Sequence, residues 1–143
     1  MTLQACVFCQ PDKRYVIADS GYSVAVCFPD AVIKRGHFVV AVKDHVTSFT
    51  DLSPEQASDL MSFAARLAKK AEALVRAEKY YLVAIADQVR HFHLHLLPKM
   101  PGDAPIGKHI MSDSGWKAEV GECVSPDAIQ DFIRKLIGDT SQF

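Results

Sequence analysis

The segment His91-Phe92-His93-Leu94-His95-Leu96-Leu97-Pro98 is the most informative stretch of this chain. Successive side chains of a β-strand point to opposite faces, so a strand here places three histidines on one face and apolar residues on the other. The apolar face predicts packing against a long helix. The histidine face holds three of the chain's six histidines. Three charged imidazoles in one row would repel one another, so some must be neutral or bound, which indicates a functional site.

Two kinds of chemistry fit this row of histidines. A neutral imidazole can act as a nucleophile near neutral pH. Alternatively, histidines at alternate strand positions can bind one metal ion between them. The spacing alone does not choose between these two interpretations.

The remaining sequence supplies the partners of this strand. Four further segments rich in β-branched and aromatic residues predict strands, at residues 15–18, 22–28, 37–43 and 80–86. Residues 87–90 have the length of a hairpin link before the histidine strand, which is expected over residues 91–97. Residues 99–124 are expected to form a long loop.

Two helices are predicted from their first residues. Ser53, Pro54 and Gln56 form a helix start, with a capping serine, a proline at the first helical position and a capping box. Apolar residues then recur at three- and four-residue spacing as far as Val75. A second helix is expected between Ser125 and Gly138. Strands on both sides of one long helix predict an α+β fold, with a mainly antiparallel five-stranded sheet and a C-terminal helix.

The overall composition excludes several classes of protein. The 143 residues suit one domain, 1–143, and the formal net charge of −1 offers no excess of positive charge for a nucleic acid polymer. No apolar run approaches the ~20 residues of a membrane span, and the first residues do not form a secretory signal. We therefore expect a cytoplasmic protein with no membrane partner. Its four cysteines are then expected to be thiols or metal ligands.

Cys6 and Cys9 form a C-x₂-C pair, which is the spacing of a zinc knuckle. A thioredoxin-like motif has the same spacing but begins a helix after a strand, and that context is missing here. A zinc ion would need two more ligands, which the pair alone does not identify.

The segment from His91 to Pro98 resembles the signature of the histidine-triad superfamily. Residues 36–46 and 49–53 are similar to further parts of that family, and Cys6-Val7-Phe8-Cys9 is similar to the first element of its zinc-binding branch. The resemblance extends over residues 6–100. The family's Asn and Gly-Gln elements before the triad are absent, because residues 85–90 read Ile-Ala-Asp-Gln-Val-Arg.

The resemblance implies a nucleotidyl hydrolase or transferase. It implies that His93 attacks the α-phosphate of a purine nucleotide, and that His95 and His37 contact the phosphate. Asp30 is expected to bind the ribose, and Asp87 stands where the family has a group that orients the nucleotide. The implied substrates are dinucleoside polyphosphates or nucleoside phosphoramidates, with release of a nucleoside monophosphate. The implied assembly is a homodimer.

The resemblance also implies a structural zinc ion held by Cys6, Cys9, His45 and His91. If His91 binds zinc, it cannot also assist the phosphate chemistry. Two other functions stay open at this point. One is a metal-dependent hydrolase that uses His91, His93 and His95 together, and the other is a nucleotide-binding regulator with little turnover.

Overall fold

A computed structural model describes residues 6–29, 32, 34–105 and 124–138 of the chain. Five strands form one sheet in the order β1-β2-β3-β5-β4, and every pair of neighbours is antiparallel. The strands are β1 (Val16–Asp19), β2 (Ser23–Val26), β3 (Phe38–Val42), β4 (Lys79–Val83) and β5 (His93–Lys99). Short 3-10 turns, η1 (Lys13–Tyr15) and η2 (Phe49–Asp51), precede β1 and the long helix. The predicted α+β fold with a five-stranded antiparallel sheet is confirmed.

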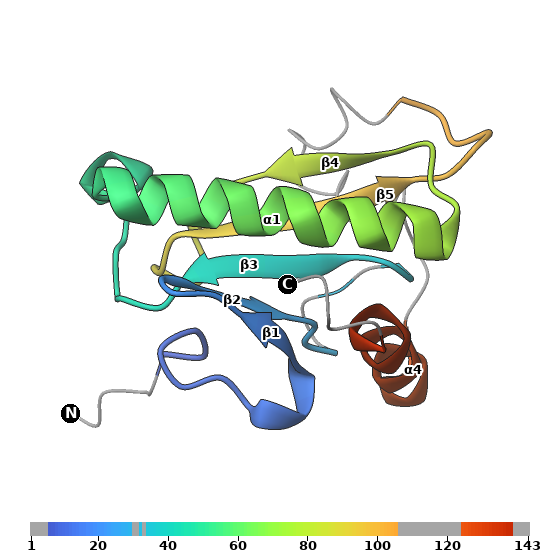
Figure 1. The fold of residues 1–143 in the computed structure, drawn as a ribbon, viewed down its shortest axis with the longest axis horizontal. Coiled ribbons are helices and arrows are strands. Elements are labelled where there is room, and N and C mark those ends of the chain that lie inside the picture. The colour runs from blue at the N-terminus through green and yellow to red at the C-terminus, as the bar shows by residue number, and fades with distance from the viewer. Residues whose placement is uncertain (1–5, 30–31, 33, 106–123, 139–143) are drawn as a thin grey trace.

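The two helices are α1 (Pro54–Val75) and α4 (Pro126–Ile137). Figure 1 shows α1 lying along the sheet, where it contacts β2, β3, β4 and β5, while α4 packs beside β1. The predicted start of α1 is confirmed in detail. Ser53 Oγ accepts the Gln56 backbone N–H at 3.1 Å, and Gln56 Oε1 accepts the Ser53 N–H at 2.9 Å. At the start of α4, Ser125 Oγ accepts the Ala128 backbone N–H at 3.1 Å.

The sheet separates two apolar clusters, because alternate residues of each strand point to opposite faces. The larger cluster joins Val40, Leu94 and Leu96 to α1 residues such as Phe63 and to the buried face of α4. The smaller cluster lies on the other face, where Phe8 packs against four sheet residues, Val24, Val26, Val39 and Ala41. The predicted contact of the apolar face of the histidine strand with the long helix is therefore confirmed.

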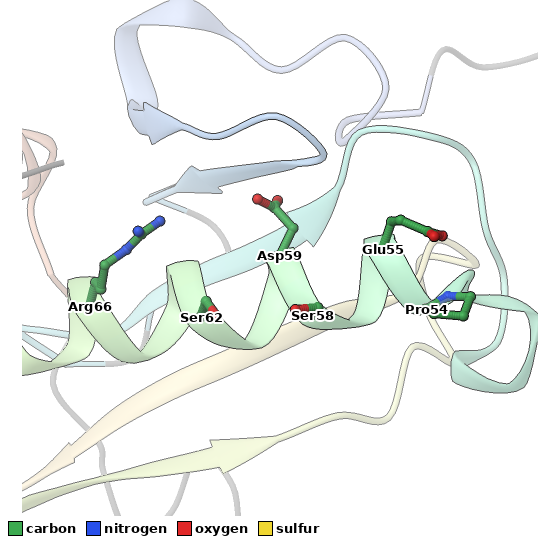
Figure 2. A pocket seen from close by; sticks show the side chains of 6 residues that line it. All are labelled: Pro54, Glu55, Ser58, Asp59, Ser62 and Arg66. Atoms are coloured by element: carbon green, nitrogen blue, oxygen red, sulfur yellow. The ribbon is translucent and has the colours of Figure 1, made fainter.

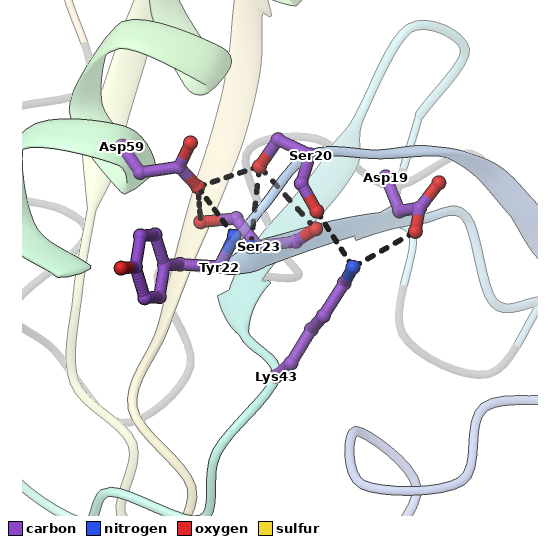
Figure 3. A network of polar contacts seen from close by, with 6 residues as sticks. All are labelled: Asp19, Ser20, Tyr22, Ser23, Lys43 and Asp59. Atoms are coloured by element: carbon purple, nitrogen blue, oxygen red, sulfur yellow. Dashed lines mark hydrogen bonds and ion pairs between the residues drawn. The ribbon is translucent and has the colours of Figure 1, made fainter. Parts of the chain in front are cut away.

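A polar network fixes α1 to the turn between β1 and β2 (Figure 3). Asp59 Oδ2 accepts hydrogen bonds from Ser20 Oγ at 2.5 Å, Ser23 Oγ at 2.9 Å and the Tyr22 N–H at 3.1 Å. On the same turn, Lys43 Nζ donates to Asp19 Oδ2 and to the Ser20 carbonyl oxygen. The Asp59 bonds connect α1 to the β1–β2 turn, and the Lys43 bonds connect the same turn to the residue that follows β3.

The strand boundaries near the histidines differ from the prediction. β4 ends at Val83 rather than at residue 86, and β5 begins at His93 rather than at His91. Ala86 has a left-handed φ of 59°, which takes the chain out of the extended conformation. The Phe92 N–H then donates to the carbonyl oxygen of Val46 at 2.6 Å, outside the sheet ladder. The link before the histidine strand is consequently longer than residues 87–90.

Among the described residues, no helix is both long enough and apolar enough to span a membrane. Asp30 and most of the predicted loop at 99–124 lie outside the described residues.

Candidate functional site

The site lies on the sheet face opposite α1, where strands β3 and β5 run side by side. His93 pairs with Ala41, and His95 pairs with Val39. Because Val39 and Ala41 belong to the smaller apolar cluster, the two histidines share that face. His37 precedes β3 by one residue, and its side chain reaches the same row from the neighbouring strand.

The His93 ring is oriented by the backbone of the preceding turn. Its Nδ1 lies 2.6 Å from the carbonyl oxygen of His91. A carbonyl oxygen only accepts hydrogen bonds, so Nδ1 must carry the proton. In the neutral ring, Nε2 then holds the lone pair. His93 is buried, and that burial lowers its pKa, which favours the neutral form that a nucleophile requires.

His37 and His95 form a second imidazole pair beside His93. His37 Nε2 lies 3.1 Å from His95 Nδ1, so one of the two rings donates a hydrogen bond to the other. Burial, and then the neighbouring His93, lowers the pKa of His95 to about 4. Burial, and then His95, lowers the pKa of the fully buried His37 as well. Such a pair can donate and accept protons beside the His93 ring, whose centroid lies 4.9 Å from that of His95.

Four residues from three parts of the chain form a cluster that could bind a metal ion. They are Cys6, Cys9, His45 and His91, and their ligand atoms all lie within 4.8 Å of one another. The His91 Nδ1 lies 3.3 Å from Cys6 Sγ and 3.5 Å from Cys9 Sγ, and His45 Nδ1 lies 3.3 Å from Cys9 Sγ. Tetrahedral zinc with bonds of roughly 2.0–2.3 Å holds its ligands about 3–4 Å apart, so these separations fit such an ion.

The His91 ring has the tautomer that a metal ligand needs. Its Nε2 lies 2.6 Å from the carbonyl oxygen of Val42 and therefore carries the proton. Nδ1, which faces the two thiols, then presents its lone pair to the cluster. A backbone acceptor behind a ligating histidine is the usual support for such a ligand.

The structure thus brings together seven of the residues predicted for the site, in two adjacent groups. Asp87 is exposed in the loop between β4 and β5, at residues 84–92. Asp30 lies outside the described residues. One residue of the site was missed by the sequence analysis: the Phe8 ring stacks on the His93 ring, with centroids 4.6 Å apart and planes 28° apart. Its place between two cysteines was the only signal that could have suggested it.

A separate open depression lies on the exposed side of α1 (Figure 2). Its lining residues all come from this helix and are Pro54, Glu55, Ser58, Asp59, Ser62 and Arg66. Because the histidines lie on the opposite face of the sheet, this depression cannot contact them. It is therefore no part of the candidate site.

Residues 11–102 match the family model of the HIT domain, which is the histidine-triad domain. The chain belongs to the HIT family. An uncharacterized HIT-like protein of Mycobacterium tuberculosis is 31% identical over 108 residues, which are 68% of this chain and 74% of that protein. The adenosine 5′-monophosphoramidase of Schizosaccharomyces pombe is 31% identical over 136 residues, which are 88% of this chain and 91% of that enzyme.

Solved HIT structures share the fold at lower sequence identity. A zinc-bound histidine-triad protein of Mycobacterium smegmatis has a TM-score of 0.69 and 20% identity, with 96% of each chain covered. The diadenosine triphosphate hydrolase of Plasmodium falciparum, solved with cyclomarin A, has a TM-score of 0.68 and 15% identity, with 92% of this chain and 79% of that chain covered. At these identities the likeness concerns the HIT fold alone.

Proposed function

We propose that this HIT protein is a nucleotidyl hydrolase or transferase that acts through a covalent intermediate on His93. The observation that carries the proposal is the hydrogen bond from His93 Nδ1 to the His91 carbonyl oxygen, since it leaves the Nε2 lone pair for attack. The adenosine 5′-monophosphoramidase of S. pombe, whose alignment covers most of this chain, supports a nucleoside phosphoramidate as substrate. Dinucleoside polyphosphates are the second candidate substrate, by analogy with the P. falciparum hydrolase.

The reaction would proceed in two steps. His93 Nε2 donates its lone pair to the α-phosphorus, and the bond from phosphorus to the leaving nitrogen or oxygen breaks. The leaving group takes a proton, which we assign to the His95 and His37 pair beside the His93 ring. Water, or another acceptor, then attacks the phosphorus and returns a proton to the histidine pair. The bond from phosphorus to Nε2 breaks, which releases the nucleoside monophosphate or its derivative. Throughout, Nδ1 keeps its proton and donates it in the hydrogen bond to the His91 carbonyl oxygen. Asp30 and Asp87 are proposed to contact the nucleotide.

This mechanism can be tested by mass spectrometry of the intact protein after brief reaction with adenosine 5′-phosphoramidate and a quench in denaturant at alkaline pH, where the bond from phosphorus to nitrogen is stable. The expected result is a transient, acid-labile adenylyl adduct on the wild-type protein that is absent from His93→Ala. The control is Ser62→Ala in α1, which covers the sheet face opposite His93, and this variant should behave as the wild type. Turnover at the wild-type rate in His93→Ala would refute the covalent mechanism.

We also propose that Cys6, Cys9, His45 and His91 hold a structural zinc ion. Four protein ligands fill a tetrahedral site, which leaves no open position for a catalytic water. In the alternative metal-dependent hydrolase, His91, His93 and His95 would share the ion. The contacts support the structural site, because His91 Nε2 is hydrogen-bonded to the Val42 carbonyl oxygen and its Nδ1 faces the two thiols. Neither nitrogen of His91 is then directed at an ion shared with His93 and His95.

The two metal sites predict different effects of Cys6→Ala. For the structural site, this variant should lose the zinc and melt at least about 5 °C lower, since binding energy of the metal contributes to folding. Cys27→Ala is the matched control, because Cys27 is buried among apolar residues, and burial raises its pKa to about 12. Full zinc content in Cys6→Ala, measured by elemental analysis, would support the shared histidine site instead.

The edge strand β4 supports the expected homodimer. Within the described part of the chain, β5 is the only strand that pairs with β4, and we propose that the other edge of β4 accepts a strand of a second copy. Leu82 on β4 and Ile85 just beyond it are large apolar residues that are 45% and 55% exposed. We expect a dimer in analytical ultracentrifugation and a monomer for Leu82→Lys. A monomeric wild-type protein would contradict this assembly.

A further inference from the structure

Phe8 lies between the two groups of the site, the histidines around His93 and the cluster of Cys6, Cys9, His45 and His91. It lies between Cys6 and Cys9 in the sequence, yet its ring stacks on His93 and is also 5.4 Å from the His91 ring. Phe8 is only 4% exposed, whereas its neighbour Val7 is 46% exposed. Of these two adjacent apolar residues, only Phe8 therefore touches the nucleophile.

The backbone of Phe8 is fixed by the same turn that aims the two thiols. The N–H groups of Cys9 and Gln10 both donate to the Cys6 carbonyl oxygen at 3.1 Å. The thiols on either side of Phe8 face His91 and His45. A metal ion held by these groups would lock this turn, and with it the position of the Phe8 ring.

The Phe8 ring restrains a motion that the hydrogen bond of His93 leaves free. A single bond from Nδ1 to the His91 carbonyl oxygen does not stop the imidazole from tilting out of line with that oxygen, which would weaken the bond and admit the other tautomer. The stacked Phe8 ring blocks this tilt on one side. The contact should also strengthen during the reaction. When Nε2 bonds to phosphorus while Nδ1 keeps its proton, the imidazole becomes cationic, and an aromatic face attracts a cation. An interaction that is stronger in the transition state raises kcat rather than lowering KM.

We propose that Phe8 is a positioning residue for His93. This inference rests on the proposed function for its effect on turnover. The stacking geometry can nevertheless be tested without turnover, since it predicts a fixed His93 tautomer.

The experiment compares zinc-loaded wild-type protein with Phe8→Leu, Phe8→Tyr and Val7→Ala. Zinc content, kcat and KM for adenosine 5′-phosphoramidate, and ¹⁵N NMR of the histidine rings at about pH 8, are measured for each. Phe8→Leu should lower kcat about tenfold at unchanged KM and full zinc content. Its His93 nitrogens should give averaged signals instead of one protonated Nδ1 and one bare Nε2. Phe8→Tyr keeps an aromatic face and should restore both kcat and the fixed tautomer, while Val7→Ala should match the wild type.

The outcomes separate this inference from the proposed function. Averaged His93 signals in Phe8→Leu, with no turnover of adenosine 5′-phosphoramidate by any protein, would uphold the positioning role and refute the reaction with that substrate. A fixed tautomer and wild-type kcat in Phe8→Leu would overturn the inference, as would a loss of kcat that only follows lost zinc. If Phe8→Leu fails to fold, Phe8→Met, which is apolar and of similar length, replaces it with the same expectations.

Discussion

At the scale of single residues, the site depends on backbone carbonyl oxygens that orient its side chains by accepting their hydrogen bonds. The His91 carbonyl oxygen orients His93, and the Val42 carbonyl oxygen orients His91. The Gly36 carbonyl oxygen accepts a hydrogen bond from the Tyr80 hydroxyl at 2.8 Å, and this bond fixes the backbone just before β3. Gly36 directly precedes His37, so this contact fixes where the His37 side chain begins.

Gly36→Ala should be strongly destabilising for two separate reasons. Gly36 has a φ of +93°, and an added Cβ would lie 3.0 Å from Pro98 Cγ and 3.0 Å from the Tyr80 oxygen. We expect a loss of at least about 2 kcal/mol in the free energy of unfolding, measured by urea denaturation. Gly102→Ala is the matched control, because its φ is +91° but nothing lies within 4 Å of the added Cβ. It should cost only about 1 kcal/mol. Equal losses in both variants would show that the packing around Gly36 is unimportant.

At the scale of elements, polar contacts set how α1 lies on the sheet. Partial burial opposes ionisation of Asp59, but hydrogen bonds from Ser20, Ser23 and Tyr22 outweigh it and lower the pKa of the carboxyl group. A carboxyl group with a lowered pKa stabilises the fold above its unfolded pKa, and that stability is lost as the pH falls through the folded pKa.

Asp59→Asn should therefore lower the free energy of unfolding by about 1–2 kcal/mol near neutral pH, since hydrogen bonds to a charged acceptor weaken. The difference from wild type should shrink in acid below the ordinary carboxyl range, where Asp59 itself becomes protonated. Asp51→Asn, in the exposed turn η2, is the control and should have little effect. A constant difference across this pH range would indicate that the Asp59 charge does not contribute.

At the scale of the whole molecule, the sequence predicted what depends on local pattern and missed what depends on distant contacts. The alternation around His93 and the capping box at Ser53 are local, and both features were predicted and observed. The Cys6, Cys9, His45 and His91 group was reached only through family resemblance, because its members are up to 85 residues apart. The early end of β4 depends on the left-handed Ala86, and the stacking of Phe8 on His93 depends on the tertiary fold. Neither leaves a periodic signal.

The partly buried His95 also makes a prediction for the stability of the whole fold in acid. His95 has a lowered pKa of about 4, and its titratable neighbours in the described chain are His37 on the β3 side and His93 on its own strand. In the unfolded chain its pKa returns to about 6.5. Between these two pH values His95 is protonated in the unfolded state but not in the folded state. The free energy of unfolding therefore falls as the pH drops below about 6.5.

We expect this effect to reach about 2 kcal/mol at about pH 5, measured as the loss in the free energy of unfolding between about pH 8 and pH 5. His95→Asn removes the titrating group, so its loss over the same range should be smaller by about that amount. Zinc release in acid affects both proteins alike, because His95 is not part of the metal cluster, and it cancels in the comparison. Parallel losses in the two proteins would mean that His95 takes up its proton as easily in the folded state as in the unfolded one. Burial would then not hold the His95 imidazole neutral in acid.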